Sequence, residues 1–203
     1  MPTLTGELCP LIDLVSFDEK KFVLDFATKS IFVASNDDEA LFHSYTGQSA
    51  LSVMVMGAYD KDGPGPIVFL EEGDKVSASS FAAYLRRYLL PFFVARGKKV
   101  GIFDNAPPHK GCARAVYGEL GLVCSDHPAN SPEVNPVELV WNRMVNMVMQ
   151  NIPWGTRITK QIFQREIRRA WAVCAGPGMF EKDMMHVAAI MAKIKQHDGG
   201  NMF

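Results

Sequence analysis

The stretch that decides the fold is Gly101-Ile-Phe-Asp-Asn-Ala-Pro-Pro-His109. An apolar run from Val100 to Phe103 stops abruptly at Asp104 and passes into a turn-forming Asn-Ala-Pro-Pro sequence. This pattern predicts a buried strand that delivers a carboxylate to its C-terminal end. Open α/β sheets place their functional sites at that end of their strands. We therefore expect Asp104 at a site, although an Asp that caps the following turn would explain it equally well.

A second stretch, Asn130-Ser-Pro-Glu-Val-Asn-Pro-Val-Glu138, opens a helix predicted from Pro136 to about Met149. Glu138 lies in its first turn, so this helix carries a second carboxylate near its start. A capping box with Asn135 as the N-cap is the simpler explanation of that Glu. Apolar residues at helical spacing predict the buried stripe of the helix, namely Val137, Val140, Trp141, Met144 and Val148.

The rest of the chain predicts strands early and helices late. The expected strands are 11–17 and 22–26 joined by a tight turn at 18–21, then 30–34, 49–59, 67–70 after a turn at 60–66, and 122–124. The expected helices are one capped by Ser77 or Ser79 that runs to about Ala95 with a kink at Pro91, then 110–120, 159–174 and 179–196.

This order predicts an α/β fold with a mixed sheet, antiparallel in its early strands and parallel in its later ones, flanked by helices. The chain has 203 residues, of which 48% are hydrophobic, which suits one core. We expect a lead-in over 1–10, a core over 11–150, and a C-terminal helical extension over 151–203 packed on the core.

The cysteines and the hydropathy of the chain indicate the cellular compartment in which the protein is expected. None of the four cysteines forms a C-x-x-C pair, which favours free thiols in a reducing compartment. The most apolar stretches, Leu51–Ala58 and Tyr88–Ala95, are too short to span a bilayer. We expect a soluble, intracellular protein with no membrane partner.

The formal net charge of −1 hides an asymmetry. Residues 1–150 hold 13 Lys/Arg against 18 Asp/Glu, whereas residues 151–203 hold 8 against 4. A basic C-terminal quarter could grip a phosphate backbone, although a solvated helix face is the simpler explanation. The basic residues of that quarter that could contact DNA are Arg157, Lys160, Arg165, Arg168 and Arg169.

Three acids scattered in the sequence could meet at one end of the sheet: Asp18, Asp104 and Glu138. Without a cation, carboxylates held close together would repel each other. With Mg²⁺ or Mn²⁺ they form a cage of hard oxygen ligands, and two such ions about 4 Å apart can drive phosphodiester cleavage. The pattern therefore predicts a metal-dependent nuclease site, in which Glu19 or Asp13 would compete for the role of Asp18.

Several other residues could assist these acids. Asn105 and His109 follow Asp104 closely, and the histidine could orient a phosphate or a water molecule, although a hydrogen-bonded loop histidine is an equal alternative. Lys20, Lys110 and Arg114 are placed to meet phosphates near such a site. No sequence resembling a nucleophile elbow occurs, which argues against a serine or cysteine triad.

At these residues the chain resembles a known family. The run Asp104-Asn-Ala-Pro-Pro-His109 with Ser131-Pro-Glu-Val-Asn-Pro-Val-Glu138-Leu-Val-Trp141 closely resembles the catalytic domain of Tc/mariner-type DDE transposases. Val15-Ser-Phe-Asp18-Glu-Lys-Lys-Phe22 looks like that family's first acidic motif, and residues 53–59 and 66–70 are similar to its middle strands. The resemblance covers about residues 12–150.

The resemblance implies an RNase H-like fold and makes Asp18, Asp104 and Glu138 the three metal-binding catalytic acids. The implied reaction is hydrolytic cleavage at transposon ends and strand transfer into target DNA, with two Mg²⁺ or Mn²⁺ ions. The implied partner is double-stranded DNA, the implied assembly is a homodimer, and the implied location in a eukaryotic cell is the nucleus.

The chain also departs from a full transposase of this kind, which carries N-terminal helix-turn-helix domains. Strands are predicted here from about residue 11, so we expect an isolated catalytic domain or a truncated gene product. Two alternatives stay open. One is a host-adopted or decayed relative that binds DNA or protein without cutting. The other is a different RNase H-like nuclease, such as a resolvase, which the motif around Glu138 disfavours.

Overall fold

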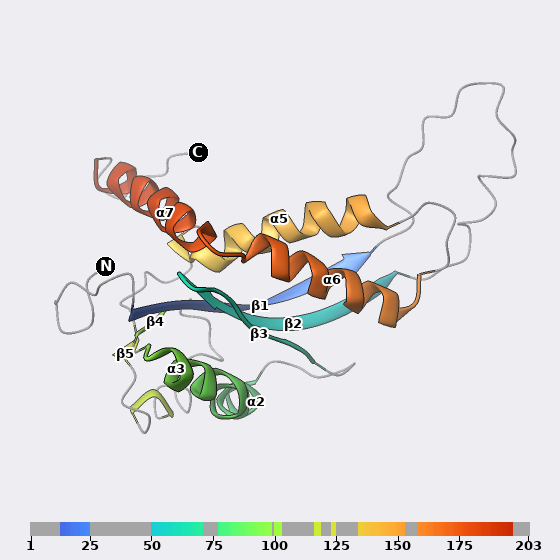
Figure 1. Ribbon diagram of the computed structural model, residues 1–203, viewed down its shortest axis with the longest axis horizontal. Coiled ribbons are helices and arrows are strands. Elements are labelled where there is room, and N and C mark those ends of the chain that lie inside the picture. The colour runs from blue at the N-terminus through green and yellow to red at the C-terminus, as the bar shows by residue number, and fades with distance from the viewer. Residues whose placement is uncertain are drawn as a thin grey trace, which may run out of the picture.

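The computed structural model describes residues 13–24, 50–70, 77–98, 100–102, 116–118, 123–124, 134–152 and 158–196. In these parts of the chain a five-stranded sheet lies between two helical layers (Figure 1). Helices α5 (Pro136–Asn151), α6 (Lys160–Cys174) and α7 (Met179–Gln196) cover one face of the sheet, and α2 (Ala78–Tyr84) and α3 (Leu90–Arg96) cover the other (Figure 1). None of the described helices combines the length and the apolar character needed to cross a bilayer.

The strand order in the sheet is β3-β2-β1-β4-β5. β1 (Leu14–Leu24), β2 (Leu51–Asp60) and β3 (Gly63–Phe69) pair antiparallel. β4 (Val100–Ile102) and β5 (Val123–Cys124) continue the sheet in parallel from β1. The predicted mixed sheet, antiparallel early and parallel late, is thereby confirmed.

β1 corrects the hairpin predicted for residues 11–26. Residues 18–21, predicted as a turn, continue the strand, and each pairs with β2, from Asp18 opposite Gly57 to Lys21 opposite Met54. No Gly, Pro or Asn lies within residues 14–24 to supply a turn. The charged residues therefore sit in the middle of a strand.

The connection between β2 and β3 is also shorter than predicted. β3 begins at Gly63, so the turn consists of Lys61 and Asp62 rather than residues 60–66. Gly63 has φ of 109°, which favours glycine. Pro64 and Pro66 are accommodated because β3 is an edge strand, where a missing N–H leaves no central ladder bond unmade.

The helices lie close to their predicted bounds. Ser77 caps α2 (Ala78–Tyr84), as expected, and the chain continues through the π-helical segment η2 (Leu85–Leu89) into α3 (Leu90–Arg96). The wider π turn directly precedes Pro91, which cannot donate to the carbonyl four residues back. The structure therefore has a π segment where the sequence predicted a kink.

On the other face lie α5 (Pro136–Asn151), α6 (Lys160–Cys174) and α7 (Met179–Gln196). The predicted strand at 30–34 lies outside the described residues. Of the predicted helix at 110–120 the structure describes 116–118, which are helical.

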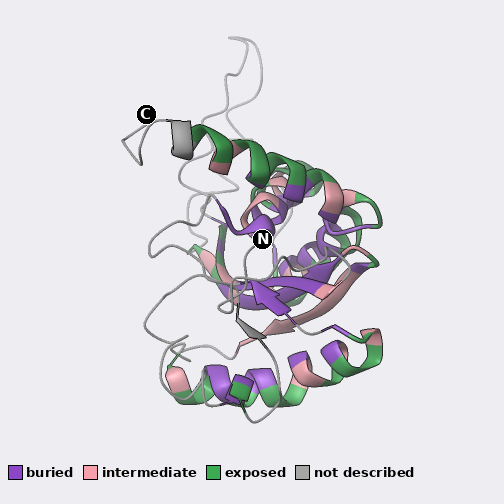
Figure 2. Cartoon of the chain, turned by 90° about the vertical axis from the view of Figure 1, so that its left-hand side faces the viewer, coloured by how far each residue is buried: buried purple, intermediate pink, exposed green. Residues whose placement is uncertain are grey.

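The core follows from the stripe predicted for α5, all of whose residues are buried. The sheet and the inward faces of the helices form a buried interior, whereas the outward faces are exposed (Figure 2). Trp141 of α5 stacks on Trp171 of α6 with ring centroids 5.1 Å apart. Both rings lie over Gly57, where an added Cβ would stand 2.6 Å from Trp141 and 3.0 Å from Trp171. Gly57 thus lets the two indoles reach the sheet.

We expect Gly57→Ala to lower the free energy of unfolding by about 1–3 kcal/mol, because the added methyl group must displace the stacked indoles. Urea unfolding followed by tryptophan fluorescence measures this. Gly118→Ala is the matched control, since no atom of the described residues lies within 4 Å of its added Cβ. Equal stability of the two variants would contradict the close packing over Gly57.

Candidate functional site

A buried hydrogen-bond cluster ties β1 to the start of α5. The Ser16 hydroxyl donates to Asn135 Oδ1 (2.7 Å) and accepts from the Val137 backbone N–H (2.9 Å). Asn135 Nδ2 in turn donates to the Phe17 carbonyl (3.4 Å). Asn135 is the N-cap residue of α5, yet its side chain makes no capping bond. Ser16, which is 121 residues away from Val137 in the chain, supplies the cap instead.

This arrangement sets the environment of Glu138. Its carboxylate accepts a hydrogen bond from Lys20 Nζ at 3.3 Å, and the two side chains are 21% and 30% exposed. The capping-box explanation of Glu138 is wrong, because the N-cap of α5 makes no side-chain hydrogen bond of that kind. Glu138 instead faces β1, across 118 residues of sequence.

Asp18 lies on the same side of β1 as Ser16 and Lys20, because side chains alternate along a strand. The contacts of Ser16 and Lys20 with α5 show that this side faces α5. Asp18 is only 7% exposed, and its Oδ1 accepts from the Glu19 backbone N–H at 2.8 Å. The structure thus brings Asp18 and Glu138, both predicted site residues, to one face of the sheet.

Glu19, which the sequence left as a competitor for the role of Asp18, lies on the opposite face. Its neighbour Phe17 points there too, since its ring stacks on Phe81 of α2 with centroids 6.2 Å apart. Burial raises the pKa of Tyr84 in α2, and the negative charge of Glu19 raises it further. Both observations put Glu19 toward α2, so it does not share the face that Asp18 and Glu138 occupy.

Six predicted residues lie outside the described parts of the chain: Asp104, Asn105, His109, Lys110, Arg114 and Arg157. β4 is described as far as Ile102, which is the Cα partner of Ser16. Asp104 follows Ile102 by two residues, as Asp18 follows Ser16.

The donors at this site suit a hard divalent cation. No group of three His, Cys, Asp or Glu side chains within the described ranges is arranged to hold a metal. The two acids that the structure does describe both offer carboxylate oxygens, the ligands that Mg²⁺ and Mn²⁺ prefer. The Glu138 carboxylate is paired with one cationic side chain, that of Lys20.

The predicted DNA-contacting residues of α6 are in a different environment. Glu166, 5% exposed, accepts hydrogen bonds from Arg165 Nε (3.1 Å) and Arg169 Nη1 (3.4 Å). The two arginine side chains remain 64% and 70% exposed. Arg168 lies over the Phe69 ring, 4.5 Å from its centroid. Lys160 opens the same helix.

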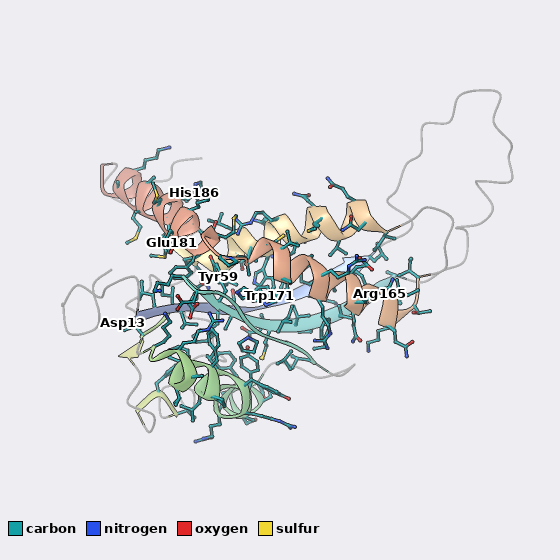
Figure 3. The ribbon with its side chains drawn as sticks, in the orientation of Figure 1. Asp13, Tyr59, Arg165, Trp171, Glu181 and His186 are labelled. Atoms are coloured by element: carbon teal, nitrogen blue, oxygen red, sulfur yellow. The ribbon has the colours of Figure 1, made fainter. Side chains whose placement is uncertain are left out.

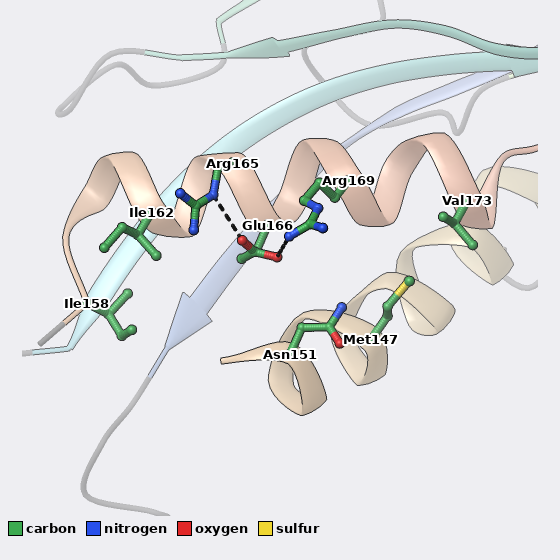
Figure 4. Close-up of a pocket in the computed structure, with 8 residues that line it drawn as sticks. All are labelled: Met147, Asn151, Ile158, Ile162, Arg165, Glu166, Arg169 and Val173. Carbon is green, nitrogen blue, oxygen red and sulfur yellow. Dashed lines mark hydrogen bonds and ion pairs between the residues drawn. The ribbon is translucent and has the colours of Figure 1, made fainter. Parts of the chain in front are cut away.

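Arg165 and Arg169 border a groove of about 490 Å³ between α5 and α6 (Figure 4). Its other lining residues are Met147, Asn151, Ile158, Ile162, Glu166 and Val173. Met147, the α5 lining residue nearest to Glu138 in the helix, lies about 14 Å along α5 from it at 1.5 Å per residue, so the groove is separate from the acids. The groove was not predicted from the sequence. The signal that could have indicated it is Glu166, a charged residue at a buried position of α6.

A second polar cluster, also not predicted, anchors α7. Arg143 of α5 makes two hydrogen bonds of 2.7 Å to Asp183 of α7, and the Tyr59 hydroxyl donates to the same carboxylate at 2.9 Å. Tyr59 lies between the sheet and this helical layer (Figure 3). Burial, and then the charge of Asp183, raise the pKa of Tyr59. The cluster holds β2, α5 and α7 together.

The chain is similar to known proteins in sequence pattern and in fold. Residues 13–159 match the profile of a family described as DDE superfamily endonuclease. A comparison with curated protein sequences gives no match.

Solved structures of Mos1 transposase share the fold. The paired-end complex with the left transposon end has a TM-score of 0.73 at 17% identity, over 95% of this chain and 57% of that one. The catalytic domain of Mos1 mariner transposase gives 0.67 at 17% identity, over 95% and 85%. The paired-end complex with Mn gives 0.70 at 16% identity, over 95% and 57%. The chain thus has an RNase H-like fold and spans 57% of the chains in those paired-end complexes.

We expect Ser16→Ala to destabilise the protein by about 1–3 kcal/mol, because it leaves Asn135 Oδ1 and the Val137 N–H without their hydroxyl partner in a buried site. The midpoint of urea unfolding should fall while its slope stays unchanged. Ser52→Ala removes an exposed hydroxyl from β2 and serves as the control. An unchanged midpoint for Ser16→Ala would show that the cluster does not hold α5 on β1.

Proposed function

This chain belongs to the DDE superfamily of endonucleases, and from that membership we propose that it is a metal-dependent DNA endonuclease of the transposase type. The proposed reaction is cleavage at transposon ends followed by strand transfer into target DNA. One observation supports this most: the buried Ser16–Asn135–Val137 cluster holds Glu138 of α5 on the face of β1 that carries Asp18.

In this proposal Asp18, Asp104 and Glu138 hold the metal ions. Asp104 is included because it follows Ile102 at the same interval as Asp18 follows Ser16, the Cα partner of Ile102. When bound, two Mg²⁺ or Mn²⁺ ions would activate the attacking oxygen and stabilise the leaving oxygen of a phosphodiester. Structures of Mos1 paired-end complexes with Mn and with Mg fit this proposal.

The protein's own contribution is to fix the carboxylates before DNA arrives. Asp18 is buried in a paired strand, and the Glu19 N–H orients one of its oxygens. Glu138 is held by the first turn of α5, whose start is tied to β1. Groups that are fixed in advance need no reorganisation during the reaction. This preorganisation usually contributes the largest part of the rate enhancement at such sites.

The proposed substrate is double-stranded DNA, gripped through its phosphates by the outer side of α6. Arg165 and Arg169 are mostly exposed, and each directs a hydrogen bond toward Glu166, while a guanidinium group carries five N–H donors in all. Buried Glu166 keeps the two guanidinium groups beside each other on one helix. They border the groove whose α5 side is lined by Met147 and Asn151, and these residues follow Glu138 along α5 by about 14 and 20 Å at 1.5 Å per residue.

A second candidate function is DNA or protein binding without cleavage. The Lys20–Glu138 ion pair favours it, because this pair neutralises Glu138 without a metal. The two candidates differ in whether the acids take up a divalent cation and cut DNA.

We expect the wild-type chain to nick supercoiled plasmid in Mn²⁺. Asp18→Asn, Asp104→Asn and Glu138→Gln should each reduce nicking roughly a hundredfold or more, because each removes a ligand charge from a preorganised site. Glu19→Gln should nick like the wild type, since Glu19 lies on the opposite face of β1. Gel quantification of relaxed plasmid over time gives the rates.

Nicking that survives in any of the three acid variants would remove that residue from the site. Equal nicking by all variants would indicate a contaminating nuclease. A wild-type chain that binds duplex DNA but never nicks it would support the second candidate function.

For DNA binding, we expect Arg165→Gln/Arg169→Gln to weaken affinity for a duplex and to flatten its salt dependence by about one unit of slope for each phosphate that is no longer neutralised. Fluorescence anisotropy at several salt concentrations measures both, at a temperature where circular dichroism shows all variants folded. The matched control is Arg86→Gln/Arg87→Gln, a pair of exposed arginines on the opposite helical layer. Equal slopes for both double variants would exclude α6 as the phosphate grip.

A further inference from the structure

Lys20 is the cation that the described part of the chain places on Glu138. Its Nζ lies 3.3 Å from Glu138 Oε2, and both side chains are more than two-thirds buried. The pair joins β1 to the first turn of α5 across 118 residues. Exposed ion pairs contribute little, but a partly buried one is less screened and harder to replace with water.

The position of Lys20 explains why it takes this role. It lies two residues after Asp18 on the same side of β1, so its charge is added to the face that carries both acids. Lys21, the next residue, is exposed and points to the other face. Carboxylates gathered on one face repel each other unless a positive charge is present. Lys20 supplies that charge in the metal-free protein.

The same contact opposes metal binding. A divalent cation on Glu138 would compete with the Lys20 ammonium for carboxylate oxygen, and two cations on one carboxylate repel each other. We propose that Lys20 is a resident counter-cation that exchanges with the metal: it neutralises Glu138 in the metal-free protein, leaves when a divalent ion binds there, and so sets the affinity for that ion. This inference rests on the proposed function.

The exchange also reconciles two roles for Lys20. Its sequence position suggested a contact with a substrate phosphate, whereas the structure pairs it with Glu138. Once displaced, its ammonium group stays tethered beside the acids on a flexible four-carbon stem. It then becomes a donor for a phosphate oxygen at the same site, so the metal-loaded protein gains a DNA contact that the metal-free protein lacks.

The test is a titration of the DNA-free protein with Mn²⁺. The EPR signal of unbound Mn²⁺ reports how much of the ion the protein has taken up. Lys20→Met keeps most of the side-chain volume but removes the charge, and should bind Mn²⁺ roughly fivefold more tightly than the wild type. Lys20→Arg keeps the charge and should not gain affinity. Lys21→Met removes a neighbouring charge from the other face and is the matched control, which should resemble the wild type.

Two further readouts separate exchange from a general charge effect. In a Glu138→Gln background, Lys20→Met should no longer tighten Mn²⁺ binding, because the contested carboxylate is gone. The metal-free Lys20→Met protein should melt at a lower temperature than the wild type. Saturating Mn²⁺ should raise the melting temperature of Lys20→Met by more than it raises that of the wild type.

Each outcome has a distinct meaning. Mn²⁺ binding that is the same in wild type, Lys20→Met and Lys21→Met would overturn the exchange role of Lys20 and leave the proposed nuclease function standing. An equal increase in Mn²⁺ affinity in Lys20→Met and Lys21→Met would overturn it as well, since the change in net charge alone would then explain the effect. Failure of wild type and Lys20→Met alike to take up Mn²⁺ would contradict the proposed function itself, and this inference with it.

Discussion

The site depends on a single buried hydrogen-bond cluster in which a strand caps a helix. Ser16 of β1 satisfies the Val137 N–H, and Asn135 bridges Ser16 and the Phe17 carbonyl. Polar groups in an apolar interior are costly unless they are paired. These groups pair well only when α5 starts directly over the N-terminal half of β1. That requirement fixes the position of Glu138 relative to Asp18.

The apolar packing enforces the same arrangement. Phe22 of β1 meets Trp141 of α5 edge to face, with centroids 6.0 Å apart, and the absence of a side chain at Gly57 lets both stacked indoles approach the sheet. The Arg143–Asp183–Tyr59 cluster adds a second polar anchor at another part of α5. β1 therefore serves two layers: Ser16, Asp18, Lys20 and Phe22 face α5, whereas Phe17 faces α2. A register shift by one residue would exchange these faces.

Much of the fold could be predicted because its signals are local. The spacing of Val137, Val140, Trp141, Met144 and Val148 gave the helix and its buried side, and the apolar run before Asp104 gave β4. The turn predicted at residues 18–21 was wrong, because four charged residues in the middle of a strand have the same composition as a turn. The Glu138 capping box was wrong because its competitor, Ser16, lies far away in sequence. The groove beside Glu166 depends on how α5 and α6 pack against each other, and no local sequence pattern predicts that packing.

The measurement that tests the central claim most directly is the anomalous scattering of Mn²⁺ in crystals of this protein. We predict anomalous density at the face of β1 that carries Asp18, within coordination distance of the carboxylates of Asp18, Asp104 and Glu138. Density elsewhere on the protein, or none there at a Mn²⁺ concentration that fills other sites, would contradict the assignment of these three acids as the metal centre.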